Sequence, residues 1–386
     1  MKKLLIITDM YPHERNPIAG IFVRQQVVEL SKLYDTMVLA THFPAKPSCR
    51  KTSEDNHALW YVHYPMSKRF FPITVYHYRK YVISRLKDIL KNWQPEIIHV
   101  HDCRHIPELF ALAPVLKNYT GKKFLSIHNI KTLPERAEHP ILSLFYNATL
   151  KAAFQNWDHV FFVNQKLRQR IEHIVPLIRS SNLGNAISPF KPIPNPYTDE
   201  LISWLKADHY KIISAGNLVK TKGFDLLIQA VKTLNADGEK PQLVIVGEGE
   251  ERERLTHLCI SLQMQDLIRI DGARENALLR SSYPLFDAFV LPSYSESFGI
   301  VYLEALYAGI PVVGVKGQGI HGIFQNSVHA LFCEPNDVSD LIQKIKQMMR
   351  NPQLMKSMTD LGKQLVCKEY MMEHLIRRIT NIYEIS

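Results

Sequence analysis

Residues 288–315, AFVLPSYSESFGIVYLEALYAGIPVVGV, contain two apolar runs separated by a polar loop and a helical pattern. The first run ends at Leu291, and the helical pattern extends from about Phe298 to the residue before Gly309. Gly309 is a typical helix stop, and Pro311 begins the second run because proline cannot continue a helix. The order strand, loop, helix, strand predicts a βαβ unit with two parallel strands.

The same alternation of short apolar runs and longer helical patterns fills the rest of the chain. Amphipathic segments such as Phe22–Leu33 and Asp225–Leu234 separate the runs. The runs are nearly continuous, which is expected when helices cover both faces of a parallel sheet. The sequence therefore predicts a doubly wound α/β fold. The strand candidates are Leu4–Thr8, Met37–Ala40, Ile97–His101, Phe124–Ile127, His159–Val163, Ile212–Ala215, Gln242–Val246, Ala288–Leu291 and Pro311–Val315.

A proline cluster interrupts this alternation at residues 189–196 and predicts a linker. The chain has 386 residues, which is long enough for two or three domains. Two similar domains in tandem would bind ligands in the cleft between them, at the carboxyl ends of their strands. The expected parts are an N-terminal domain (1–188), a linker (189–208), a second domain (209–365) and a C-terminal helix (366–386) that crosses back to the N-terminal domain.

The composition is that of a soluble globular protein, with 46% hydrophobic and 22% charged residues. The first apolar run is shorter than a signal-peptide core, because Asp9 ends it. No stretch reaches the roughly 18–20 apolar residues of a membrane-spanning helix. The five cysteines are odd in number and scattered, so they indicate neither a disulfide framework nor a zinc site. We therefore expect a cytosolic protein.

The loop and first helical turn of residues 288–315 predict an anion site. A helix N-terminus presents free N–H groups and a partial positive charge, here at Phe298, Gly299 and Ile300. Glu304 lies in the second turn and could accept hydrogen bonds from a ligand on that N-terminus, while Glu296 in the loop would face what lies beyond the phosphates. The alternative is that Ser295 or Ser297 caps the helix and both glutamates are solvated.

A second loop, Gly216–Gly223, follows a strand candidate and carries Lys222, whose ammonium group could reach a diphosphate. Taken alone, it is equally a solvated lysine loop. A third loop, Gly247–Arg252, resembles a dinucleotide-binding fingerprint but has arginine in place of the third glycine. A tight strand-to-helix turn is an equal alternative for this loop.

Together these segments resemble the retaining glycosyltransferases of family 4, the group 1 transferases, which have the two-domain GT-B fold. The spacing of Glu296 and Glu304 around Phe298-Gly299 is the specific part of the resemblance. The resemblance implies two Rossmann-like domains that face each other across a deep cleft. The N-terminal domain would bind the acceptor, and the C-terminal domain would bind the nucleotide sugar.

The resemblance also implies roles for single residues. Glu304 would bind the donor ribose, Glu296 would bind the transferred sugar, and Lys222 would bind the diphosphate. His128, with Glu296 and Lys222, would form the catalytic group. The further donor-binding residues would be Gly20, Gly216, Asn217, Ala273, Phe298, Gly299 and Ile300, with Ala273 near the nucleobase as part of Asp271-Gly272-Ala273.

In the N-terminal domain, Pro17-Ile18-Ala19-Gly20-Ile21-Phe22 is similar to the first glycine loop of the family. His99 and His101 end one strand candidate, and His128 follows another. By resemblance His128 would lie beside the donor sugar, and His101 with Asp102 would lie on the acceptor side. The alternative for each histidine is a strand-end side chain with a satisfied hydrogen bond, and it is favoured for His99.

Four segments depart from the family pattern. Asn217 stands where arginine is usual, and Asn185-Ala186-Ile187-Ser188 replaces an Asn-Gly-Val-Asp run. Ala19 occupies the place of a second glycine, and Gly319–Ile323 lacks an acidic residue. These departures bear on efficiency and donor identity more than on the class of reaction.

No two aspartates are separated by a single residue, so the metal-binding Asp-x-Asp of other glycosyltransferases is absent. We therefore expect a hexosyltransferase without metal or cofactor, with the nucleotide sugar as co-substrate. The family implies retention, and a UDP-sugar is favoured over GDP-mannose. The acceptor would be a glycan or a lipid-linked molecule in cell-surface polysaccharide or glycolipid synthesis.

Residues 66–93 mix basic and aromatic side chains, which favours contact with anionic lipid and a peripheral place at the inner membrane face. An ordinary solvated basic helix is an equal alternative. The net charge of +10 also admits nucleic acid as a partner, but none of its recognition patterns is present, and we expect no such partner. Another GT-B enzyme, an epimerase or a phosphorylase, is the remaining alternative.

Overall fold

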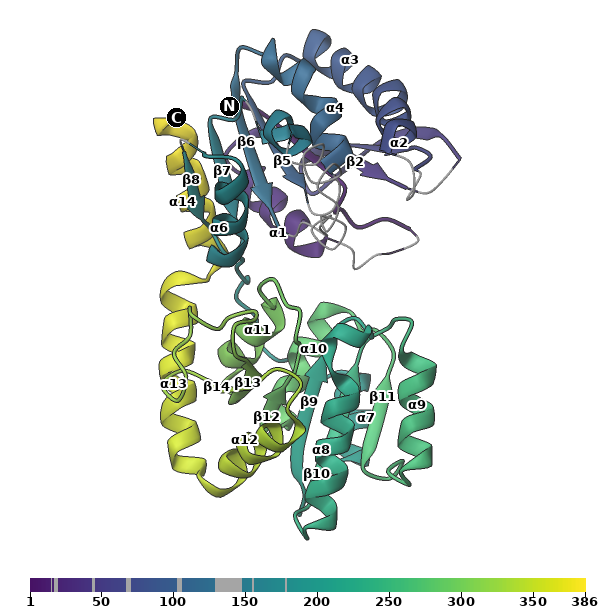
Figure 1. Ribbon diagram of the computed structural model, residues 1–386, viewed down its shortest axis with the longest axis vertical. Helices are drawn as coiled ribbons and strands as arrows, with labels where there is room; N and C mark the ends of the chain where they lie inside the picture. Colours follow the sequence, from purple (N-terminus) through teal and green to yellow (C-terminus); the bar gives the residue numbers. More distant parts are fainter. Residues whose placement is uncertain are drawn as a thin grey trace. The chain divides into compact units, whose positions relative to one another are not determined.

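The computed structural model divides into two compact units (Figure 1). Unit 1 contains Met1–Asn185 and Met372–Ser386, and unit 2 contains Ala186–Met371. The structure describes residues 1–14, 16, 20–43, 46–66, 71–102, 106–128, 148–154, 156–177 and 179–386, so unit 2 is described in full. The expected linker 189–208 contains a helix of unit 2, α7 (Pro196–Trp204), whose N-terminus is closed by the Asn195 capping box.

Unit 1 is built on a mostly parallel sheet. Among the described residues its strand order is β3-β4-β2-β1-β5-β6-β7-β8, and only β3 is antiparallel to its neighbour. The strands are β1 (Lys3–Thr8), β2 (Asp35–His42), β3 (Ser48–Glu54), β4 (His57–His63), β5 (Ile97–Asp102), β6 (Lys122–Ile127), β7 (His159–Phe162) and β8 (Ser180–Asn182).

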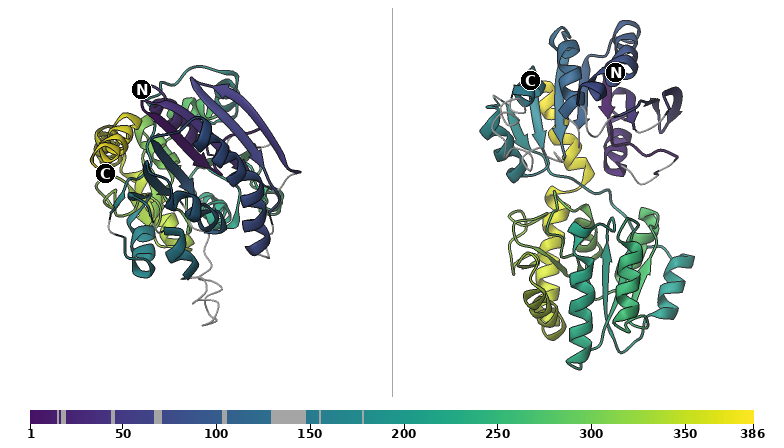
Figure 2. Two further views of the ribbon diagram at one scale, coloured as in Figure 1. Left: turned by 90° about the horizontal axis from the view of Figure 1, so that it is seen from above. Right: turned by 45° about the vertical axis from the view of Figure 1, so that its right-hand side comes forward.

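The helices of unit 1 join these strands. They are α1 (Ile21–Leu30), α2 (Phe71–Tyr78), the π-helical turn η1 (Arg79–Ile83), α3 (Ser84–Asn92), α4 (Ile106–Lys117), α6 (Gln165–Ile174) and α14 (Met372–Ile385). The C-terminal helix α14 packs against α1 (Figures 1 and 2). Its Tyr383 is buried, and the hydroxyl group is hydrogen bonded to Nδ1 of His99 at 2.6 Å. The last helix of the chain is therefore part of the core of unit 1.

Unit 2 has a fully parallel sheet of order β11-β10-β9-β12-β13-β14. Its strands are β9 (Tyr210–Ala215), β10 (Pro241–Val246), β11 (Ile268–Asp271), β12 (Ala288–Val290), β13 (Val312–Val315) and β14 (Leu331–Cys333). Its remaining helices are η3 (Lys220–Lys222), α8 (Phe224–Ala236), α9 (Arg252–Ser261), α10 (Asn276–Ser282), η4 (Tyr283–Leu285), α11 (Ile300–Ala308), α12 (Val338–Arg350) and α13 (Pro352–Glu369).

In each sheet the order of strands reverses at one point. The reversal lies between β1 and β5 in unit 1 and between β9 and β12 in unit 2. The loops that leave the carboxyl ends of two such strands diverge to opposite faces and form the usual ligand site of a doubly wound sheet. Both sheets therefore have one edge position where chemistry is expected.

The nine strand candidates of the sequence are confirmed, as is the doubly wound α/β class. The hairpin β3–β4 and the strands β8, β11 and β14 were not expected. In β3 the exposed residues are polar, so that strand carries no apolar run. Among the helices of the described residues, none is long and apolar enough to cross a bilayer.

Candidate functional site

The reversal point of unit 2 brings two of the predicted loops together. β9 and β12 are adjacent and parallel, with Ile213 opposite Phe289, so the loops that follow them leave the sheet side by side. Two contacts join the loops: the N–H of Tyr294 donates to the carbonyl of Thr221 at 3.0 Å, and Gly223 packs against Pro292. A Cβ on Gly223 would lie 2.4 Å from the Pro292 carbonyl oxygen, so only glycine allows this approach.

Lys222 and Glu296 face each other across these two loops. Their side chains form an ion pair, with 16% and 12% of the side-chain surface exposed. The backbone of Glu296 is held as well, because its N–H donates to Gln318 Oε1 at 3.2 Å and its carbonyl accepts from Gly319 at 3.0 Å. The two residues predicted to bind diphosphate and sugar thus neutralise each other when no ligand is present.

The N-terminus of α11 adjoins this ion pair. Its N-cap is Gly299, at φ 80° and ψ 73°, with no side-chain cap. A Cβ at Gly299 would lie 2.5 Å from the Tyr302 ring and 3.3 Å from Cγ of Glu296, so the glycine is required and Glu296 lies against the helix start. The first N–H groups of a helix have no acceptor within the helix. The serine cap considered from the sequence is therefore not at the N-cap position, and the helix start can accept an anion.

Phe298 and Ile300 contribute backbone rather than side chain to this helix start. The Phe298 ring is buried and lies 6.0 Å from the ring of Tyr370. It anchors the loop in the core of unit 2, which fixes the direction of the N–H groups that follow.

Glu304 lies in the second turn of α11 and is 2% exposed. Its Oε1 accepts hydrogen bonds from Asn276 Nδ2 at 3.0 Å and from Arg280 Nε and Nη2 at 3.0 and 2.9 Å. Its Oε2 accepts a long one, 3.4 Å, from the Tyr283 hydroxyl. The alternative of two solvated glutamates is therefore wrong: both are paired, and Glu304 is buried.

Asn276, Arg280 and Tyr283 were not singled out in the sequence. A buried carboxylate needs a paired cation, so Glu304 implied some partner. The available signal was the spacing of Asn276 and Arg280, which at i and i+4 share one face of a helix. Without the fold, nothing in the sequence indicated that this face meets α11.

The loop Gly247–Arg252 packs closely on the loop after β9. A Cβ at Gly247 would lie 1.9 Å from the Gly216 carbonyl oxygen, and one at Gly249 would lie 2.3 Å from the Leu218 carbonyl oxygen. These glycines therefore serve a tight strand-to-helix turn, as one of the two interpretations held. Gly216 is part of this contact, whereas the neighbouring Asn217 is exposed.

The predicted base-binding residues Asp271-Gly272-Ala273 follow β11 on the same edge of the sheet. Asp271 is buried and accepts hydrogen bonds from the Tyr197 hydroxyl at 2.8 Å and from Arg269 Nε at 2.6 Å. Burial, with the Asp271 carboxylate beside it, raises the pKa of Tyr197. Ala273 is exposed, so its backbone is accessible to a ligand.

The reversal point of unit 1 lies between Gly20 and the two histidines that follow β5 and β6. Gly20 is buried at φ 63°, and a Cβ there would lie 2.2 Å from the Met10 carbonyl oxygen. The segment Pro17–Ala19 of the predicted glycine loop lies outside the described residues. Phe22 in the first turn of α1 contacts His128 edge to face, with ring centroids 4.8 Å apart.

His101 and His128 form a buried pair. Nδ1 of His101 is hydrogen bonded to Nε2 of His128 at 3.0 Å, and among the described residues the other two ring nitrogens have no partner. Burial lowers the pKa of His128 to about 4 and holds that of His101 well below its ordinary value. Both rings are therefore neutral near pH 7. Asp102 ends β5, and its side chain lies outside the described residues.

His99 differs from this pair because both of its ring nitrogens have partners. Nε2 is hydrogen bonded to Ser126 Oγ at 2.8 Å, and Nδ1 to Tyr383. Burial lowers its pKa to about 3. The interpretation of His99 as a satisfied strand-end side chain is confirmed.

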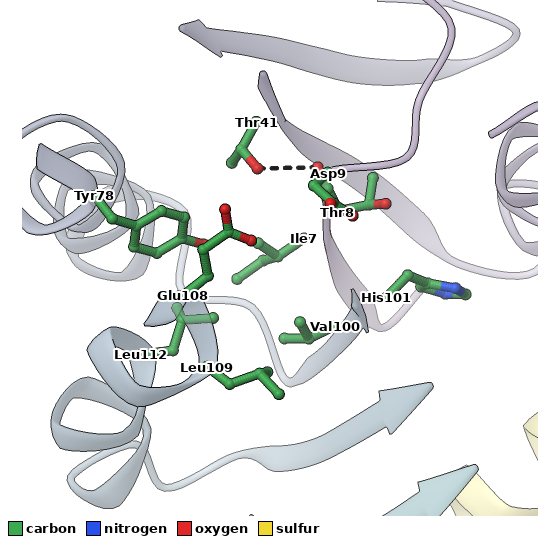
Figure 3. Close-up of a pocket in the computed structure, with 10 residues that line it drawn as sticks. All are labelled: Ile7, Thr8, Asp9, Thr41, Tyr78, Val100, His101, Glu108, Leu109 and Leu112. Carbon is green, nitrogen blue, oxygen red and sulfur yellow. Dashed lines mark hydrogen bonds between the residues drawn. The ribbon is translucent and has the colours of Figure 1, made fainter. Parts of the chain in front are cut away.

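A small cavity lies beside His101 at the ends of β1 and β5 (Figure 3). Tyr78 and Glu108 point toward each other across it, and Glu108 also accepts a hydrogen bond from the Tyr64 hydroxyl. The cavity has room for about one water molecule. It is therefore too small to hold a sugar. No group of three or more metal-ligating side chains occurs among the described residues.

Comparison with known proteins extends these observations. Residues 202–365, which contain the ion pair, the α11 start and Glu304, match the family model described as "Glycosyl transferases group 1". Over its whole length the chain has the GT-B fold: it superposes on HepE from Anabaena, solved in complex with UDP-glucose, with a TM-score of 0.75 and 14% identity, covering 100% of both chains.

Two curated relatives match part of the chain. The lipopolysaccharide core biosynthesis glycosyltransferase LpsD of Rhizobium meliloti is 32% identical over 156 residues, which are 40% of this chain and 44% of LpsD. An uncharacterized glycosyltransferase of Methanocaldococcus jannaschii is 26% identical over 234 residues, 59% of this chain and 60% of the relative. The chain thus spans about half the length of the curated relatives that it matches.

Proposed function

We propose that this protein is a glycosyltransferase that moves a hexose from a nucleoside diphosphate donor to a glycan or lipid-linked acceptor, with retention and without a metal ion. The observation that carries the proposal is the ion pair of Lys222 and Glu296 at the uncapped start of α11. It places one cation, one carboxylate and free N–H groups at a single point. A diphosphate would occupy the helix start and Lys222, and the sugar bound to it would face Glu296.

The chemical step follows from this placement. The oxygen of an acceptor hydroxyl group forms a bond to the anomeric carbon, and the bond from that carbon to the diphosphate oxygen breaks. The hydroxyl proton passes to the departing phosphate oxygen, so the products are a glycoside and a nucleoside diphosphate. Lys222 and the α11 N–H groups stabilise the negative charge that develops on the leaving group, the role that a divalent ion has in other transferases.

The neutral histidines of unit 1 suit a binding role in this reaction. An imidazole with a pKa of about 4 does not protonate a leaving group at pH 7, but it can hydrogen bond a sugar hydroxyl. His128 would bind the donor sugar, and His101 would bind the acceptor side. Gly20 would allow the loop before α1 to approach the ligand closely.

A UDP-sugar is the favoured donor, and GDP-mannose is the second candidate. The solved complex of HepE with UDP-glucose supports the first choice. The name of LpsD supports an acceptor of the lipopolysaccharide class and a role in cell-surface polysaccharide synthesis.

Thermal-shift screening against UDP, GDP, ADP and NAD tests the donor class, with stabilisation by one nucleoside diphosphate but not by NAD as the expected result. Incubation with the corresponding nucleotide sugar should then release the diphosphate at the same rate with and without EDTA. NMR of the glycoside would give its anomeric configuration. A transition unmoved by all three diphosphates would reject the proposal, and an inverted product or a rate that needs metal would reject those parts of it.

We also propose that the segment 71–93 contacts an anionic membrane surface, which would place the enzyme peripherally at the inner face. Tyr76 and Ile73 on α2 are 60% and 44% exposed, and Arg79 and Lys80 follow on the same helical stretch. An open groove of about 520 Å³ begins beside them, lined by Pro72, Val75, Tyr76, Arg79, Phe110, Ala148 and Thr149. Exposed aromatic and aliphatic side chains next to cations are typical of interfacial segments.

Not every residue of this segment is available for lipid. Tyr78 belongs to the core, and Arg85 lies over the Trp60 ring at 4.4 Å. Co-sedimentation with phosphatidylglycerol vesicles at low salt is the test, with Arg79→Glu plus Lys80→Glu as the variant and the exposed Lys232→Glu of unit 2 as the control. Equal sedimentation of variant and control, or no binding by the native chain, would remove the membrane contact.

A further inference from the structure

The carboxylate of Glu304 is held unevenly. Three N–H donors, one from Asn276 and two from Arg280, converge on Oε1 at 2.9–3.0 Å. Oε2 receives only the Tyr283 hydroxyl, at 3.4 Å. Unit 2 is described in full, so this asymmetry is a property of the protein part of the site. One oxygen is saturated and the other retains acceptor capacity.

The donors to Oε1 come from a single rigid element. Asn276 and Arg280 lie one turn apart on α10 and present the same face to α11. The Arg280 guanidinium group is buried and lies 5.0 Å from the ring centre of Phe190, on the side away from no other cation. The Phe190 ring lies in turn 4.9 Å from the ring of Tyr307 on α11. Arg280 is therefore fixed by an aromatic contact as well as by the carboxylate.

An ion pair that serves stability alone would gain most from the bidentate geometry, in which the guanidinium group donates to both carboxylate oxygens. Here both nitrogens donate to the same oxygen. A buried acceptor that lacks a full set of donors costs free energy. That cost is offset if a hydroxyl group of a ligand completes the set.

We infer that Arg280 and Asn276 are positioning residues that hold Glu304 so that Oε2 alone is presented to the ribose of the donor. This inference rests on the proposed function, because it takes the ligand at α11 to be a nucleoside diphosphate. Oε2 then accepts one strong hydrogen bond from one ribose hydroxyl group. The other hydroxyl group gains little from Glu304, because Oε1 is already saturated.

The experiment compares ligands and variants in one cycle. Dissociation constants of UDP, 2′-deoxy-UDP and 3′-deoxy-UDP are measured by isothermal titration calorimetry on the full chain. For the native protein, loss of one of the two hydroxyl groups should weaken binding by about 10-fold or more, as expected for a hydrogen bond to a charged group. Loss of the other should weaken it by less than about 3-fold. If screening identifies GDP or ADP as the ligand, the corresponding deoxy pair replaces the uridine series.

Asn276→Ala and Arg280→Lys should reduce this discrimination to less than about 3-fold by weakening UDP while leaving the less favoured deoxy analogue unchanged. A merely structural role would weaken all three ligands together. Arg254→Lys is the matched control, since Arg254 on α9 pairs with Asp225 and Glu251 and should leave the ratios unchanged. Asn276→Ala keeps the buried ion pair, so it provides the test if Arg280→Lys does not fold.

Unchanged discrimination in Asn276→Ala would overturn the inference, as would equal losses from both deoxy analogues in the native protein. Failure of the native protein to bind UDP, GDP or ADP would instead overturn the proposed function. The two failures are therefore distinguishable in the same titrations.

Discussion

The two sheets place different chemistry at the same topological position. At the reversal point of unit 2 the side chains are charged and paired with each other, Lys222 with Glu296 and Arg280 with Glu304. At the reversal point of unit 1 they are His101 and His128, which are buried and neutral. Unit 2 can therefore bind an anion by exchanging ion-pair partners. Unit 1 can only offer hydrogen bonds, which suits hydroxyl groups.

This difference teaches how one fold can divide a transfer reaction. Charge on the leaving group needs a cation whose own partner can be displaced, and the half-buried pair at α11 provides it. Sugar hydroxyls need neutral donors and acceptors in a fixed direction, and the imidazole pair provides those. The predictions below test each side of the comparison, from the largest expected effect to the smallest.

Lys222→Ala removes the cation of unit 2 and should have the largest effect. We expect a loss of about 100- to 1000-fold in kcat/KM with the nucleotide sugar, because a preorganised group that stabilises leaving-group charge contributes about 2.7–4 kcal/mol. Release of the diphosphate is the measurement. Lys220→Ala is the control, since Lys220 is exposed on the same short helix η3. Similar rates for the two variants would remove Lys222 from the mechanism.

The buried histidines of unit 1 should make the protein sensitive to acid. The pKa of His128 is lowered to about 4 from its ordinary value of 6.5, so its contribution is complete above pH 6.5 and is lost as the pH falls toward 4. Between pH 7 and pH 5 this histidine alone should cost about 2 kcal/mol of the free energy of unfolding. Urea unfolding followed by circular dichroism measures the loss in the native protein and in His128→Asn.

The His128→Asn protein should lose about 2 kcal/mol less than the native protein over this pH range. His257→Asn is the control, because His257 is exposed on α9 of unit 2. An identical pH dependence for His128→Asn and the native protein would show that the histidine pair does not provide the difference between the units.

The sequence was sufficient for the regular part of this comparison. β9 and β12 are continuous apolar runs, and Lys222 and Glu296 lie directly after them, so a parallel sheet with adjacent strands brings them together. Arg280 could not be predicted, because its partner Glu304 lies on another helix and no local pattern marks the pairing. His101 and His128 were expected at strand ends, but their mutual hydrogen bond depends on the neighbouring positions of β5 and β6. Their neutral state depends on burial, which the sequence does not give residue by residue.

Glu296→Gln tests whether the ion pair of unit 2 is exchanged on binding. In the native protein a diphosphate must compete with Glu296 for Lys222. The variant removes that competitor, so UDP should bind about 5-fold more tightly, while turnover falls because the contact to the sugar is weakened. Calorimetry and initial rates give the two quantities. Weaker UDP binding in the variant would contradict the exchange, and Glu250→Gln, an exposed change in a neighbouring loop, is the control.

Asn217→Arg should sharpen the charge difference between the units by adding a cation to the loop after β9. Asn217 is exposed and precedes Leu218, whose backbone is fixed by the carbonyl of Glu248, so a longer side chain is tolerated without a change in the loop. An exposed charge contributes about 0.2–1 kcal/mol, so UDP should bind up to about 5-fold more tightly. The gain should disappear in 1 M salt, where screening acts within about 3 Å. Asn217→Gln should have no such effect, and a gain that persisted in high salt would show that the new side chain acts by packing rather than by charge.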